Sequence, residues 1–160
     1  MESERRGEVK TETMKIRGFI RGQIVESDTG KVVSDTGLIE NKVCNYGLQA
    51  LQAFAAAAAG SNKPIYAVLA TQTDAMNITQ TAMSGTSNAF RSMTASGTTG
   101  SSATFNVSFA GSDGAISVGG AAIHTTNAQG GLWAGQVFTA SSMATNQNFN
   151  LTYTLAFASA

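Results

Sequence analysis

Few residues in this 160-residue chain could do acid–base, nucleophilic or metal chemistry. There is one histidine, His124, and one cysteine, Cys44. A catalytic histidine needs a nucleophile and an orienting acid, yet Asp74 and Asp113 are the only acidic residues after Glu40. The sequence therefore predicts no catalytic residue. It predicts a structural role for His124, either hydrogen-bonded or exposed.

Cys44 and the two aspartates have ordinary structural interpretations. Cys44 precedes a predicted helix, whose N-terminus could lower the thiol pKa, but a single cysteine is more often a small buried side chain. Glycosidases need two carboxylates at a set separation, and calcium sites draw several acids from one loop. Asp74 and Asp113 have no acidic neighbours, so we expect turn residues, no metal and no cofactor.

The glycine pairs and the largest aromatic residues also allow two interpretations. The glycines within residues 111–114 and 119–120 lack the spacing of a phosphate-binding loop, and they predict a turn or a bulge. Trp133 and Tyr153 could form an aromatic platform for a carbohydrate. Both residues stand among strand-patterned apolar residues, so the sequence favours a place in the core.

Composition argues against two classes of partner. Only 12% of residues are charged, against about 25% in an ordinary soluble domain. Formal net charge is zero and no basic block is present, which argues against a nucleic-acid binder. No apolar run reaches the roughly 18 residues of a membrane span, and the charged N-terminal segment lacks the apolar region of a signal peptide. We therefore expect neither nucleic acid nor membrane as a partner.

Charge is unevenly placed along the chain. Residues 1–63 hold nine of the ten basic and eight of the ten acidic residues, whereas residues 64–160 hold three charges. A free domain needs scattered charge for solubility and to protect its strand edges. Either other copies or partners cover much of this surface, or the chain is a polar, uncharged monomer. The first explanation is favoured.

The chain divides into a predicted N-terminal arm, residues 1–13, and one β-sandwich domain, residues 14–160. The arm carries seven charges and only two apolar residues, Met1 and Val9, so it cannot form a core alone. One α-helix is predicted near residues 45–59, with Asn45 as its N-cap, Gln49 near the capping-box position and Gly60 after its end. Its predicted apolar stripe consists of Leu48, Leu51, Phe54 and Ala55.

Alternating apolar and polar residues predict strands through the rest of the chain. The predicted strands are residues 15–25, 31–33, 38–43, 65–70, 89–94, 103–109, 115–125, 132–139 and 149–157. Residues 71–88 predict a loop, and the Gly/Ser/Thr run at 96–102 predicts a turn. Short strands with frequent turns predict a mainly β fold, an antiparallel, jelly-roll-like β-sandwich.

Two parts of the chain resemble one family. Residues 20–33 (IRGQIVESDTGKVV) and 39–51 (IENKVCNYGLQAL) resemble the opening strands and helix of small structural proteins of tailed bacteriophages and related viruses. Residues 118–124 (VGGAAIH), 132–138 (LWAGQVF) and 149–157 (FNLTYTLAF) are similar to the closing strands of a common virion β-domain. The chain departs from the family pattern at Gly119, where an acid is frequent, and at Gly135-Gln136, where a basic residue is frequent. The subfamily therefore stays open.

The resemblance implies a virion structural protein present in many copies, with no catalytic residues. The small size, the charged arm and the charge-poor body favour a capsid decoration or cement protein that bridges capsid subunits. A tail or head-fibre component is the next interpretation. A receptor- or glycan-binding module is the alternative from another class, and an enzyme is least favoured. The expected location is the virion. The expected partners are other copies of the chain, as a homo-oligomer, and other virion proteins, above all the major capsid protein.

Overall fold

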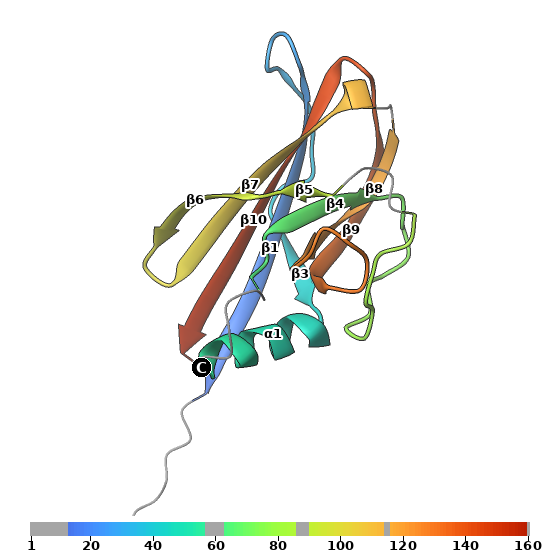
Figure 1. Cartoon of the computed structure of the whole chain (residues 1–160). Coiled ribbons are helices and arrows are strands. Elements are labelled where there is room, and N and C mark those ends of the chain that lie inside the picture. The colour runs from blue at the N-terminus through green and yellow to red at the C-terminus, as the bar shows by residue number, and fades with distance from the viewer. Residues whose placement is uncertain (1–12, 57–62, 86–89, 114–115, 160) are drawn as a thin grey trace, which may run out of the picture.

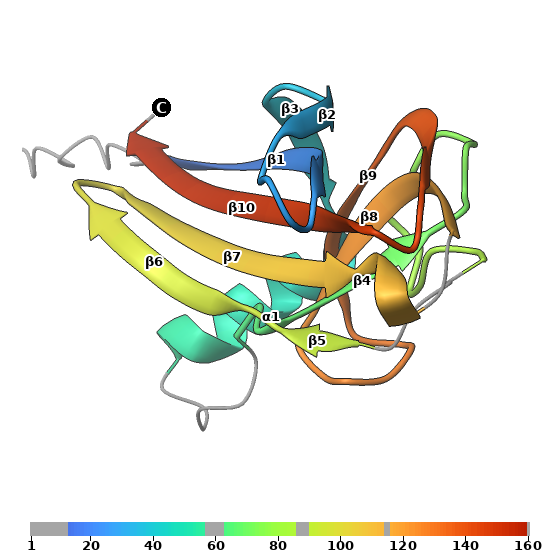
Figure 2. The same cartoon turned by 90° about the horizontal axis from the view of Figure 1, so that it is seen from above.

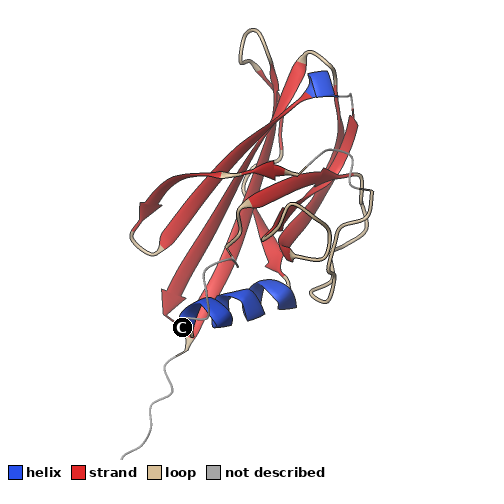
Figure 3. Cartoon of the chain, viewed as in Figure 1, coloured by secondary structure: helices blue, strands red, loops and turns tan. Residues whose placement is uncertain are grey.

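The predicted mainly β fold with one α-helix is confirmed. The computed structural model describes residues 13–56, 63–85, 90–113 and 116–159. Within these residues the strands form one antiparallel sheet that curls until it is nearly closed into a barrel-like shape (Figure 1), and α1 (Asn45–Ala55) lies beside it (Figure 3).

The strands follow the predicted segments closely. They are β1 (Met14–Glu26), β2 (Val32–Asp35), β3 (Ile39–Val43), β4 (Tyr66–Ala70), β5 (Arg91–Ser92), β6 (Thr94–Thr99), β7 (Ser102–Ala110), β8 (Ile116–His124), β9 (Leu132–Met143) and β10 (Gln147–Ser159), with a short 3-10 helix η1 (Gly111–Asp113) after β7. The loop at residues 71–85 is also as predicted.

The strand order explains how the sheet curls. The order is β5-β4-β8-β9-β3-β1-β10-β7-β6, with β2 also paired to β1. β3 joins the two halves, because it pairs with β1 over residues 39–41 and with β9 over residues 42–43. The two end strands, β5 and β6, follow each other in the chain and are separated only by Met93. The chain thus connects the two ends of the sheet at this seam, although β5 and β6 do not pair with each other (Figure 2).

The longest pair of strands, β1 and β10, carries one half of the core. They pair in register from Met14 opposite Ser159 to Glu26 opposite Gln147. Period-2 alternation sends one face of each strand inward, and β10 buries Phe149, Leu151 and Tyr153 there. The alternation in the sequence therefore predicts the inward face of this strand correctly.

The half made of β4, β8 and β9 is buried on both faces. One face packs against the β1–β10 half through side chains such as Leu69 and Ile123. The other face packs in a second cluster with Met76 and Met83 from the loop at residues 71–85. Strands buried on both faces have continuous apolar runs rather than alternation, as in the sequence of β4. The bulge expected at Gly119-Gly120 is confirmed by a register shift within β8.

Tight turns connect the strands around β2. Gly30 and Gly37 have φ values of 68° and 69°, a left-handed conformation that glycine adopts without a steric penalty. Both glycines end a Ser-Asp-Thr-Gly segment. The second segment differs in part from its expected role as a turn, since Ser34 and Asp35 belong to β2.

The predicted details of the helix need three corrections. The carbonyl of Cys44 accepts the first helical hydrogen bond, from the Leu48 amide, so Cys44 is at the N-cap and Asn45 is the first helical residue. Leu48 is 41% exposed. The buried face instead contains Gly47 and Ala50, because α1 approaches β9 closely. The helix ends at Ala55, whereas the expected Gly60 end lies outside the described residues.

The Gly/Ser/Thr run at residues 96–102 is a further correction. A turn is expected there, but residues 94–99 form strand β6, paired with β7, and the turn is reduced to Gly100 and Ser101. The backbone ladder with β7 stabilises an extended conformation there, although residues 94–98 are small and exposed. An edge strand has little apolar surface to bury, so its composition can resemble that of a turn. This is why the composition of residues 96–102 predicts a turn.

Candidate functional site

Trp133 and Tyr153 lie in the core, with 2% and 0% of their surface exposed. The indole Nε1 of Trp133 donates a hydrogen bond to the Tyr153 hydroxyl at 3.0 Å. Burial raises the pKa of Tyr153, and the hydrogen bond from Trp133 offsets this in part. These aromatic rings are therefore not available as a surface platform for sugars.

Asn41 is a buried residue that the sequence analysis missed. It is 7% exposed, and neither of its amide atoms has a hydrogen-bond partner among the described residues. Its side chain occupies the space above Gly18, where a Cβ atom would collide with Asn41 Oδ1. The only sequence signal for its burial is its place on β3, between Ile39 and Val43 at period 2.

Cys44 is fully buried, as expected for a structural cysteine. Burial raises the pKa of its thiol to about 11. The helix N-terminus would act in the opposite direction, so desolvation dominates here. Cys44 stays a protonated thiol near neutral pH and is not an activated nucleophile.

His124 differs from both expected structural roles, since it is buried and its ring has no hydrogen bond within the described part of the chain. It is 0% exposed, and its two ring nitrogens have no hydrogen-bond partner among the described residues. Its ring packs edge-on against Phe90, with centroids 4.9 Å apart. Burial lowers its pKa to about 4, so the imidazole is neutral near pH 7. No nucleophile and acid are arranged around it in the described part of the chain.

The two aspartates after Glu40 lie in separate places with different surroundings. Asp74 is an exposed residue of the loop at residues 71–85, where its backbone carbonyl accepts a hydrogen bond from Gln72. Asp113, at the end of η1, forms an ion pair with Arg91 of β5. Thus two of the three charges in residues 64–160 pair with each other. Within the described residues no group of three or more His, Cys, Asp or Glu side chains could hold a metal ion.

Two arginines on the outer face of β1 are also paired. Arg17 binds Glu40 through two hydrogen bonds of 2.7 Å. Arg21 binds Asp35 in the same bidentate manner, at 3.1 and 2.5 Å. The Arg21 guanidinium lowers the pKa of Asp35. The arginines are therefore held as parts of neutral pairs rather than as free cations.

Beside these pairs lies a surface that we call the neutral face. Its side chains belong to β10 and β7, point away from the core and are half-buried or exposed. The neutral face consists of Asn150, Thr152, Thr154 and Ala156 on β10 and of Ser102, Thr104, Asn106 and Ser108 on β7. Neighbouring hydroxyls contact each other across the strands, as the 3.3 Å distance between Thr104 and Thr154 shows. The same period-2 alternation in β7 and β10 that predicts which residues point to the core also predicts which residues form the neutral face.

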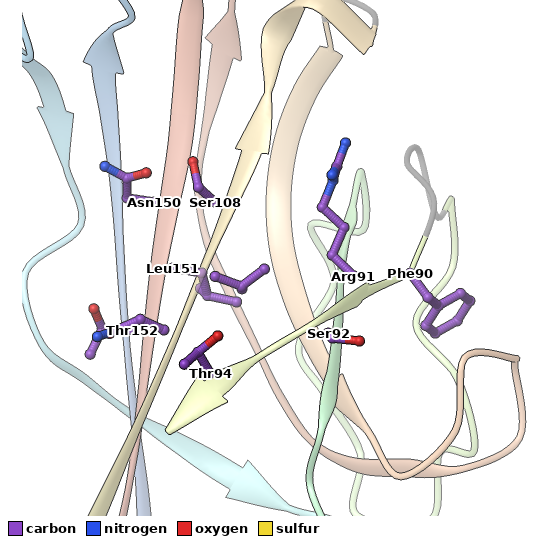
Figure 4. Close-up of a pocket in the computed structure, with 10 residues that line it drawn as sticks. Phe90, Arg91, Ser92, Thr94, Ser108, Asn150, Leu151 and Thr152 are labelled. Atoms are coloured by element: carbon purple, nitrogen blue, oxygen red, sulfur yellow. The ribbon is translucent and has the colours of Figure 1, made fainter. Parts of the chain in front are cut away.

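One groove of about 810 Å³ opens beside the neutral face. β5, β6 and the residue before β5 contribute Phe90, Arg91, Ser92 and Thr94, whereas β7 and β10 contribute the remaining lining residues (Figure 4). Four of those residues, Asn106, Ser108, Asn150 and Thr152, also belong to the neutral face. The groove offers hydroxyl and amide groups and the ion-paired Arg91, whereas the Phe90 ring lies at its margin and packs against His124. The described lining contains no pair of titratable groups suited to acid–base catalysis.

The described helix is too short and polar to cross a membrane. No family model, curated protein or solved structure matches this chain. The features that bear on function are therefore the neutral face and the groove beside it.

Proposed function

We propose that the chain is a virion structural protein, and specifically a capsid decoration or cement protein that bridges capsid subunits. The observation that carries this proposal is the neutral face on β7 and β10, bordered by arginines that are already paired. Burying an unpaired charge in an interface is costly, whereas hydroxyl and amide groups need only hydrogen-bond partners. A protein that is covered by neighbours on a particle benefits from such a face.

The distribution of charge along the sequence supports the same proposal. Residues 1–13 carry seven charges of both signs, and such a segment has little apolar surface to bury in its own fold. It is suited to ionic contacts with an adjacent capsid subunit. The proposed arrangement places the body on the particle through the neutral face and the arm on a neighbouring subunit.

The experiment is imaging of virus particles that lack the protein, with and without the purified chain. Added protein is expected to occupy a fixed number of symmetric positions on the capsid. Thr104→Lys places a charge in the middle of the neutral face and should lower occupancy at least tenfold. Thr73→Lys is the matched control, because Thr73 is exposed on the loop at residues 71–85. Binding only to tails would instead favour a tail or head-fibre component.

A receptor- or glycan-binding module is a second candidate, favoured by the groove. Its lining of hydroxyl and amide groups has the hydrogen-bonding chemistry of a carbohydrate site. Ser108→Lys would obstruct this groove, because Ser108 is exposed. Saturable binding of an oligosaccharide that is lost in Ser108→Lys and kept in Thr73→Lys would support this function over the capsid role.

A further inference from the structure

The curled sheet leaves three strands with a free edge among the described residues. β5 and β6 end the strand order, and β2 pairs only with β1. A free edge exposes unpaired N–H and C=O groups, which form a template for another strand. Soluble proteins protect such edges by shortness, charge, proline or a bulge. These three edges differ in their protection.

The edges of β2 and β5 are protected. β2 has four residues, includes the ion-paired Asp35, directly follows Lys31 and pairs irregularly with β1. β5 has two residues, and one of them is Arg91, in its ion pair with Asp113. An approaching strand at either edge would have to desolvate a charge.

The edge of β6 has much less protection. Its six residues, Thr-Ala-Ser-Gly-Thr-Thr, include no charge and no proline. Residues 94–98 are exposed, and the strand pairs only with β7 in the described structure. One register shift lies between Ala95 and Gly97, whereas Gly97, Thr98 and Thr99 pair regularly with β7. β6 also points away from the body of the molecule in both views (Figures 1 and 2).

We propose that β6 pairs with β6 of a second copy of this chain, antiparallel across a two-fold axis. Charge selects this occupant. An uncharged edge meets its own copy without repulsion, and an isologous contact presents the same surface on both sides. The arm of a second copy fits this edge less well, since its seven charges would lie along neutral groups. The joined molecules would form one continuous sheet with two neutral faces.

This inference rests on only one part of the proposed function, the expectation of contacts between copies. It does not depend on the virion. A chain that dimerises through β6 but never occupies particles would contradict the virion role and leave the edge pairing intact. A chain that occupies particles through the neutral face but stays monomeric in solution would contradict the edge pairing alone.

The first measurement is sedimentation of the full chain over a concentration series. The native chain is expected to dimerise, and Thr98→Lys should weaken the dimer at least tenfold, because it places like charges near each other across the axis. Thr73→Lys adds the same charge at an exposed loop position and should dimerise as the native chain does. Thermal melting shows that each variant is folded. A monomeric native chain, or a Thr98→Lys variant that dimerises unchanged, overturns the proposal.

The second measurement locates the contact. Opposed residues in an antiparallel pair have Cα atoms about 4.5–5.5 Å apart, within the reach of a disulfide or a short thiol cross-linker. Cys44 is buried, so an introduced cysteine is the accessible thiol. Only the residue nearest the two-fold axis opposes its own copy, so at least one of Ser96→Cys and Thr98→Cys should give cross-linked dimers, whereas Thr73→Cys should not. Equal cross-linking of all three variants would show random collision and contradict pairing at β6.

Discussion

At the scale of single residues, His124 is the clearest electrostatic feature of the core. Its buried imidazole has no hydrogen-bond partner among the residues that the structure describes, so the neutral form is favoured, because a charged ring would be desolvated without compensation. The residue opposite His124 on β4 is Tyr66. His124 therefore couples the stability of the fold to pH.

The first prediction concerns that coupling. The folded pKa of His124, about 4, lies below its ordinary value of 6.5, so the unfolded chain binds the proton more tightly. The contribution of neutral His124 to the free energy of unfolding is complete above pH 6.5. It falls by up to about 3 kcal/mol as the pH drops toward 4. Urea unfolding of the native chain and of His124→Leu between pH 7 and 4 checks this. The variant should lack this part of the pH slope, and parallel slopes would contradict the account.

The second prediction separates the two faces of β10. Leu155 is 6% exposed and belongs to the core, whereas Thr154 lies on the neutral face. Leu155→Ala should cost about 2–5 kcal/mol of unfolding free energy, because it leaves a cavity. Thr154→Ala loses only a 3.3 Å hydroxyl contact with Thr104 and should cost less than about 1 kcal/mol. Equal losses in chemical denaturation would mean that the faces are assigned wrongly.

Residue types predict burial well where the side chain is apolar and poorly where it is polar. The alternation around Phe149 and Tyr153 is enough to predict that their side chains point inward. His124 and Asn41 are fully or nearly buried although their side chains are polar. Period-2 alternation alone cannot tell whether a strand face with polar residues is exposed to solvent or packed against another element. For His124 the cover comes from Phe90, a residue distant in sequence.

At the scale of elements, α1 is fixed by close contact with β9 rather than by a broad apolar stripe. A Cβ atom on Gly47 would collide with the carbonyl oxygen of Trp133. This contact is between backbones, so no flexible side chain can move aside. Leu48 is wrongly placed in the predicted stripe for the same reason, because Gly47 and Ala50 are buried against the sheet, whereas Leu51 packs against the core as predicted.

The third prediction tests that contact. Gly47→Ala improves helix propensity by about 1 kcal/mol, but the clash with Trp133 should outweigh this gain and leave a net loss of about 1–3 kcal/mol. Gln52→Ala, at an exposed position of the same helix, should change stability by less than about 0.5 kcal/mol. Denaturant midpoints measure both. A stabilised Gly47→Ala protein would show that the helix is not held this closely.

The sequence predicts most strands correctly because their alternation or apolar runs follow from burial. β6 is missed because its Thr, Ser and Gly residues bury little, and their extended conformation depends on the ladder with β7. The groove is missed for a related reason. Its lining comes from β5, β6, β7 and β10, and only the curling of the sheet brings Arg91 near Asn106.

At the scale of the whole molecule, the fourth prediction concerns the arm. Deleting residues 1–12, nearly all of the predicted arm and outside the described residues, should leave the melting temperature of the isolated protein nearly unchanged, because the segment offers little burial to offset its ordering entropy. Attachment to particles should weaken, and raised salt should mimic the deletion, since ionic contacts are screened over about 8–10 Å. Melting and particle occupancy across a salt series test this. Unfolding of the truncated protein with unchanged occupancy per folded molecule would contradict it.

In the proposed function, the neutral face attaches this protein to a particle in many ordered copies. The most direct measurement is the number of copies per particle at saturation, for the native chain, Thr104→Lys and the control Thr73→Lys. We predict a saturating number set by capsid symmetry for the native chain and the control, and a loss of occupancy of at least tenfold for Thr104→Lys. Unsaturable binding, or equal occupancy by all three proteins, would contradict the claim.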